Sequence, residues 1–129
     1  MKTSTKTVHL NANYDQVYGY LSNIENLPDW ATNFCTEVKR DGDDYKVMTG
    51  GGEIYFVMRA NADTGVLDMM AGPDKSQMAT WPARVMALPD DSSLFSFTCV
   101  KNPMISDEEF SQQCMSVDHE LEGLRQKFS

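Results

Sequence analysis

The stretch DEEFSQQCMSVDHELEGLRQKF, residues 107–128, decides the fold of this sequence. Its apolar residues recur at alternating steps of four and three, which places them on one stripe of an α-helix. The stripe consists of Phe110, Cys114, Val117, Leu121, Leu124 and Phe128. The other positions are mostly polar or charged, Glu120 among them, and Ser106 with Glu109 has the pattern of a capping box. We therefore predict one helix over residues 107–128, about 33 Å long, which is enough to cross a small domain.

The size and charge of the chain limit its class and its partners. With 129 residues it fits one domain, residues 1–129. The formal net charge of −8 argues against nucleic acid, because phosphate binding needs a basic surface. Residues 1–10 lack the apolar core of a signal peptide and no run reaches the length of a membrane span, so no membrane insertion is expected.

The cysteines point to a reducing compartment. Cys35, Cys99 and Cys114 are odd in number, widely spaced and without a CxxC or a paired histidine spacing. That arrangement is typical of buried free thiols rather than of disulfides or a metal site. We therefore expect a cytoplasmic protein.

The chain before the long helix alternates between apolar and polar residues in short runs. We predict a strand over residues 2–10, then a short helix capped by Asn13 and a second short helix near residues 25–30. Turn signals separate six further strands, which we place at residues 35–40, 45–49, 53–61, 66–71, 78–88 and 94–101. Strands joined by tight turns form an antiparallel meander, and one face of such a sheet needs a cover. Only the last helix is long enough to provide it, so the class is α+β.

The hairpin turn near residues 90–92 sets the faces of the sheet. If this turn is central, Val85 opposes Phe97 and Ala87 opposes Phe95. Because a slip of one residue would exchange the two faces, the register matters. The residues that this register turns inward are Val38, Val47, Ile54, Phe56, Met58, Leu67, Met69, Trp81, Ala83, Val85, Ala87, Phe95, Phe97 and Cys99.

The order of elements and several motifs resemble a known superfamily. The opening VHLNANYDQVYGYLSNIENLPDW, residues 8–30, resembles the first strand and helix pair of the START/polyketide-cyclase-like (SRPBCC) superfamily. The matching positions are Asn13, Asp15, Val17, Tyr18, Leu21, Asn26, Leu27, Pro28 and Trp30. FTCVKNPMISDEEF and DHELEGLRQKF are similar to the last strand and grip helix of uncharacterised bacterial members, and GVLDMM and ARVMALPDDSS also fit them.

The resemblance covers essentially the whole chain and implies a helix-grip fold. In that fold a curved antiparallel sheet, here of seven strands, wraps around the long C-terminal helix, and two short helices follow strand 1. A cavity lies between sheet and helix. The superfamily includes lipid and hormone carriers, polyketide aromatase/cyclases, ring-hydroxylase subunits and co-chaperone-like proteins, and it has no universal catalytic motif. Fold alone therefore implies little about chemistry.

Polar residues that could carry chemistry are few. His9 and His119 both point away from apolar neighbours, there is no HExxH motif, and the glycines at 50–52 form a turn without a following helix. We therefore expect no metal and no cofactor. Arg59, Asp68 and Arg84 fall on successive strands and could form an anion site, but their outward positions favour a solvent-exposed charge ladder.

The predicted site is the apolar space between sheet and helix. Its candidate ligand-binding residues are Trp30, Phe56, Met58, Met69, Trp81, Ala83, Val85, Phe97, Phe110, Cys114, Val117 and Leu121. The leading hypothesis is a protein that binds a small lipophilic or aromatic molecule and is not an enzyme. Nine methionines support it, because methionine adapts to irregular space.

Two alternatives remain open. One is a cyclase or dehydratase-like enzyme acting on a polyketide-type substrate, assisted by Tyr18, Thr36, Thr49 or Gln113. It requires a buried titratable residue at the cavity, and the sequence pattern identifies none. The other is a protein-interaction module without ligand, which would use a sheet edge or an exposed apolar patch, and a homodimer is an open possibility.

Overall fold

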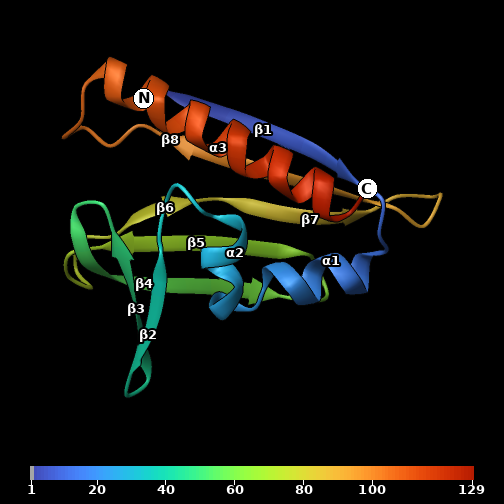
Figure 1. Ribbon diagram of the computed structural model, residues 1–129, viewed down its shortest axis with the longest axis horizontal. Helices are drawn as coiled ribbons and strands as arrows, with labels where there is room; N and C mark the ends of the chain where they lie inside the picture. Colours follow the sequence, from blue (N-terminus) through green and yellow to red (C-terminus); the bar gives the residue numbers. More distant parts are fainter. Residues whose placement is uncertain (1) are drawn as a thin grey trace.

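A computed structural model describes residues 2–129 and shows an antiparallel sheet with a long helix at its C-terminal end (Figure 1). The strands are β1 (Thr3–Leu10), β2 (Glu37–Asp41), β3 (Asp44–Thr49), β4 (Gly52–Asn61), β5 (Val66–Gly72), β6 (Ala79–Trp81), β7 (Ala83–Ala87) and β8 (Ser93–Val100). The helices are α1 (Tyr14–Leu21), the 3-10 helix η1 (Ile24–Asn26), α2 (Leu27–Trp30) and α3 (Asp107–Lys127). The predicted α+β class and long C-terminal helix are confirmed.

The sheet is open and runs in the order β1-β8-β7-β5-β4-β3-β2, with β6 paired to β5. It has eight strands rather than seven because the predicted strand at residues 78–88 divides at Pro82. Proline has no N–H for the sheet ladder and commonly marks such an interruption. Before the break Trp81 pairs with Met69 of β5, and after it Ala83 pairs with Phe97 of β8.

The hairpin between β7 and β8 corrects the predicted register. Val85 opposes Phe95 and Ala83 opposes Phe97, two residues from the predicted pairing. The shift arises because the Leu88 N–H donates to the Ser92 carbonyl (2.9 Å), which centres the turn one residue earlier. A shift of two leaves the faces unchanged, so most inward residues are buried as predicted. Ala87 lies beside the turn and is exposed, and four further inward residues are only half-buried: Val38, Ile54, Met58 and Trp81.

Helix α3 begins and packs as its sequence predicts. The Ser106 hydroxyl accepts a hydrogen bond from the Glu109 N–H (3.1 Å), and the Glu109 carboxylate accepts one from the Ser106 N–H (3.3 Å). In Figure 1 the helix lies along β1. Phe110, Leu121 and Leu124 are buried, while the other stripe members are half-buried.

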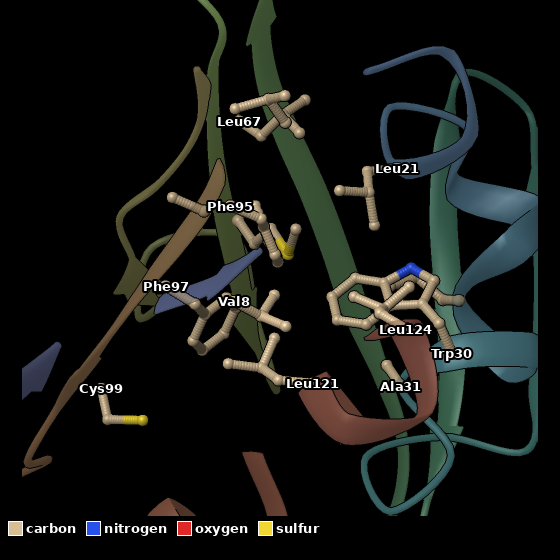
Figure 2. Packing of buried hydrophobic residues seen from close by; sticks show 14 of the residues in the cluster. Val8, Leu21, Trp30, Ala31, Leu67, Phe95, Phe97, Cys99, Leu121 and Leu124 are labelled. Atoms are coloured by element: carbon tan, nitrogen blue, oxygen red, sulfur yellow. The ribbon is translucent and has the colours of Figure 1, made fainter. Parts of the chain in front are cut away.

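The short helices α1 and α2 cover the part of the core that α3 does not cover. Helix α1 packs against β7, and α2 touches both α3 and β2. Figure 2 shows Trp30 of α2 in the buried cluster that also holds Leu21 and Leu124. Its ring meets Phe95 edge to face, with the ring centroids 6.0 Å apart. Among residues 2–129 no helix combines the length and apolar character of a membrane span.

Candidate functional site

A half-open cavity of about 360 Å³ lies between the sheet, α3 and the segment that follows α2. Exposed residues at its wall, Asn33, Gly50 and Gln113, mark where it meets solvent. Its lining residues are Leu27, Trp30, Ala31, Asn33, Phe34, Thr49, Gly50, Ile54, Phe56, Met69, Trp81, Phe97, Cys99, Gln113, Ser116, Val117 and Glu120. The wall is therefore mostly apolar on the sheet side, where Thr49 is the polar member, and partly polar along α3.

Half of the predicted site residues lie on this wall. The six that line the cavity are Trp30, Phe56, Met69, Trp81, Phe97 and Val117. The structure places the other six off the cavity: Met58, Ala83, Val85, Phe110, Cys114 and Leu121. They still belong to the apolar core or pack against it.

The reason for this division is the position of α3 over the sheet. Because the helix packs along β1, much of its apolar stripe contacts that part of the sheet, and Figure 2 shows Leu121 next to Val8. The cavity instead meets the flank of the helix, at Gln113, Ser116 and Glu120, with Val117 at the edge of the stripe. The spacing of apolar residues in a sequence identifies the face of a helix that packs against the core. The cavity borders a neighbouring face of α3, which this spacing does not identify.

Three aromatic rings gather at the cavity wall. The Phe34 ring centroid lies 6.1 Å from that of Phe56 and 6.2 Å from that of Trp81. These separations fall in the range in which aromatic pairs attract each other. The sequence analysis missed Phe34 because it belongs to the turn after α2, where the Phe34 N–H donates to the Ala31 carbonyl (3.0 Å), and no periodic pattern includes it.

Glu120 is the polar residue that the sequence analysis placed wrongly. It was assigned to the polar side of the helix, yet only 6% of it is exposed. Its Oε2 atom accepts hydrogen bonds from the backbone N–H groups of Asn33 and Phe34, both at 3.1 Å. A signal was available, because Glu120 stands three residues after Val117 and four before Leu124 and so lies close to the apolar stripe.

Burial changes the acidity of this carboxyl group. Removal from water raises the pKa of Glu120 from 4.5 to about 7, although the two backbone N–H groups favour the charged form. The Cys35 thiol is its titratable neighbour: burial raises the pKa of Cys35 to about 11, and the negative charge of Glu120 adds to this effect. Glu120 can therefore exchange a proton near neutral pH while Cys35 stays protonated.

The four polar candidates of the enzyme hypothesis are scattered. Thr49 and Gln113 line the cavity. The Thr49 hydroxyl is engaged locally, because it donates to the Gly52 carbonyl (2.7 Å) and accepts from the Gly51 N–H (3.2 Å). Thr36 is exposed, and Tyr18 stacks on Tyr14 with the ring centroids 5.5 Å apart. Neither Thr36 nor Tyr18 lines the cavity.

Other candidates lie outside the cavity. Arg59 opposes Asp68 as predicted, but Arg84 opposes Val66. The Asp68 carboxylate accepts from the Ala83 N–H (3.4 Å), and Arg84 donates to the Thr64 carbonyl (3.0 Å), so the three do not form an ion set within residues 2–129.

The histidines and cysteines also lie in surroundings that give no sign of a catalytic or metal-binding role. His9 and His119 are exposed, and His9 pairs with the Ser92 hydroxyl (2.9 Å). Cys35 and Cys99 are buried free thiols, as predicted, whereas the free thiol of Cys114 is half-buried.

Comparison with known proteins identifies the fold. No family model matches the sequence, and no curated protein matches it. Among solved structures, an uncharacterized protein from Bacillus thuringiensis has a TM-score of 0.77 at 16% identity, covering 98% of both chains. The protein XoxI from Bacillus cereus has a TM-score of 0.77 at 17% identity, covering 99% of this chain and 96% of its own.

A START superfamily protein from Mycobacterium smegmatis has a TM-score of 0.60 at 17% identity, covering 98% of this chain and 99% of its own. At these identities the likeness concerns the fold. The chain shares a helix-grip fold with this START superfamily protein, as the sequence motifs predicted.

Proposed function

We propose that this protein binds a small lipophilic or aromatic molecule in the cavity between the sheet and α3. The observation that carries the proposal is the cavity itself, which has a volume of about 360 Å³ and walls built mainly from apolar and aromatic side chains. Ligand sites of small molecules typically measure about 300 to 1,000 Å³ and combine such walls with a few polar groups. Gln113, Ser116 and Glu120 supply those polar groups here.

The free energy of the empty space supports an occupant. At about 24 cal/mol per Å³, a dry void of 360 Å³ would cost about 9 kcal/mol. That equals the whole net stability of many domains, about 5 to 15 kcal/mol. Because the cavity opens to solvent, water can enter it and offset part of this cost. A lipophilic guest would return this water to bulk and cover the apolar wall, which is favourable.

Isothermal titration calorimetry with a panel of neutral aromatic and aliphatic alcohols, including naphthylmethanol, tests the proposal. We expect saturable binding with a negative heat-capacity change, the sign of apolar burial. The variant Val117→Phe adds bulk at the cavity wall and should weaken binding about tenfold or more. Met115→Phe is the matched control, because Met115 lies on the same helix and is 68% exposed.

Two results would count against this function. One is the absence of saturable binding across the whole panel. The other is binding that survives Val117→Phe unchanged, which would place the guest elsewhere. Either result would favour the interaction-module alternative.

Glu120 supports a second candidate function, a cyclase or dehydratase-like activity. With a pKa of about 7, its carboxylate can take the proton from the carbon between two ketone groups of a poly-β-ketone. That carbon then attacks a third carbonyl carbon, and the resulting alkoxide takes the proton back from Glu120. Mass spectrometry of a poly-β-ketone incubated with the protein follows the subsequent loss of water. We expect cyclisation that Glu120→Gln reduces to the protein-free rate, and equal rates with and without the protein would exclude this function.

A cytoplasmic location and a homodimer stay predictions from the sequence. Sedimentation velocity measures the second directly. A single species with the mass of one 14.5 kDa chain would exclude the dimer.

A further inference from the structure

The cavity wall carries one formal charge, and it is negative. Of the residues that line it in the described part of the chain, Glu120 is the only acid, and no lysine, arginine or histidine is present. A bound carboxylate or phosphate would therefore meet repulsion and no counter-charge. Burying such an unpaired anion in a largely apolar site is costly, so the wall disfavours fatty and aromatic acids.

The Glu120 carboxylate is held in place through one of its two oxygen atoms. Its Oε2 atom receives both backbone hydrogen bonds, from Asn33 and Phe34, at 3.1 Å each. Within residues 2–129 its Oε1 atom has no hydrogen-bond partner. The two backbone contacts fix the carboxylate at the wall, so a donor on a guest meets a preorganised acceptor.

Aromatic rings line the same space as this carboxylate. Phe34 contributes its N–H to Glu120 and its ring to the group formed with Phe56 and Trp81. Aromatic faces are electron-rich and attract cations, most strongly when the cation leaves water. A carboxylate with aromatic rings around one cavity is an arrangement suited to an alkylammonium group on an apolar body.

We propose, building on the proposed ligand-binding function, that the cavity selects a lipophilic amine whose ammonium group pairs with Glu120 Oε1 while its apolar body covers Phe34, Phe56 and Trp81. The amine supplies the positive charge that the cavity wall lacks. It also gives the Glu120 carboxylate a counter-charge, whereas among residues 2–129 of the free protein that carboxylate has only the backbone N–H groups of Asn33 and Phe34 as partners.

Three matched probes test this selectivity: naphthylmethylamine, naphthylmethanol and naphthylacetate share one apolar body and differ in charge. Calorimetry at about pH 8 keeps Glu120 mostly ionised, given its pKa of about 7. We expect the amine to bind about tenfold tighter than the alcohol, and the acetate about tenfold weaker than the alcohol. The amine should weaken toward pH 6 as Glu120 takes up a proton, since Cys35 facing Glu120 stays neutral there.

Two substitutions assign the effect to Glu120. Glu120→Gln keeps an oxygen acceptor for Asn33 and Phe34 and removes the charge, so the amine should fall to the affinity of the alcohol while the alcohol changes less than about threefold. Gln113→Lys adds a cation to the same wall and should reverse the preference toward the acetate. Glu122→Gln is the control, because Glu122 is exposed on the same helix and pairs with Arg125.

The outcomes separate this proposal from the function on which it rests. If the alcohol binds as tightly as the amine, or the acetate binds best, the amine proposal is wrong and the ligand-binding function stands. Equal amine affinity in wild type and Glu120→Gln also overturns it. If none of the three probes binds and the alcohol panel also fails, the ligand-binding function itself is wrong.

Discussion

The replacement Glu120→Gln should stabilise the folded protein at alkaline pH. The folded-state pKa of Glu120 is about 7, against an ordinary value of 4.5 in the unfolded chain. Between these values the folded state holds a proton that the unfolded state has released. Stability from this group is therefore complete below about pH 4.5 and is lost as the pH rises through about 7.

The size of the effect follows from the same two values. A difference of about two and a half pKa units, at about 1.4 kcal/mol per unit, corresponds to about 3 kcal/mol. Glutamine cannot ionise and keeps an oxygen acceptor for the Asn33 and Phe34 N–H groups. We expect Glu120→Gln to match wild type at about pH 4.5 and to exceed its stability by up to about 3 kcal/mol at about pH 8.

Urea denaturation followed by circular dichroism measures this difference. Subtracting the two curves removes the contributions of the histidines and of other groups common to both proteins. Glu122→Gln is the control: its carboxylate is exposed and the Arg125 guanidinium holds its pKa below the usual range, so it should not reproduce the alkaline gain. A constant stability difference across the pH range, or a loss at about pH 8, would refute the assignment of a buried, uncompensated carboxylate.

Three further predictions concern the scaffold. Deleting residues 107–129 removes the cover of the sheet and should abolish cooperative thermal unfolding, and a truncated chain that still melts cooperatively would contradict this role. Asp68→Asn should change stability by less than about 1 kcal/mol by urea titration, because Asp68 lies at the outer face and asparagine can still accept from the Ala83 N–H; a loss of several kcal/mol would indicate a buried ion set. Ala83→Phe should cost about 1 to 3 kcal/mol by overpacking opposite Phe97, because Ala83 is buried and does not itself line the cavity; a variant as stable as wild type would indicate open space beside Ala83.

The sequence predicted the scaffold well because local rules fix it. The spacing of four and three residues and the capping box of Ser106 predict α3 from local sequence alone, without knowledge of tertiary contacts. The turns likewise define the strands, and Pro82 carried a usable signal for the division between β6 and β7, since proline interrupts a sheet ladder. The error of two residues in the β7–β8 register did not alter the faces, because side chains alternate with a period of two.

The site was harder to predict because it depends on how the elements sit on one another. Phe34 reaches the cavity through the turn after α2, and Glu120 reaches it because α3 packs along β1 and turns its flank toward the open space. Neither relation is visible in residue spacing. The one clue was that Glu120 is a charged residue at the border of the apolar stripe. This clue is ambiguous, because an ordinary surface helix also has polar residues beside its apolar stripe.

Chemical-shift mapping by NMR tests whether the space between the sheet and α3 is a binding cavity, because it locates a guest as well as detecting it. Naphthylmethanol added to isotopically labelled protein should move the backbone resonances of residues at the cavity wall, above all Phe34, Trp81, Val117 and Glu120, in a saturable way. We expect only small changes at Met104 and Met115, the large apolar side chains that are exposed. Shifts centred on those exposed residues, or no saturable shifts at any guest concentration, would contradict a binding cavity between the sheet and α3.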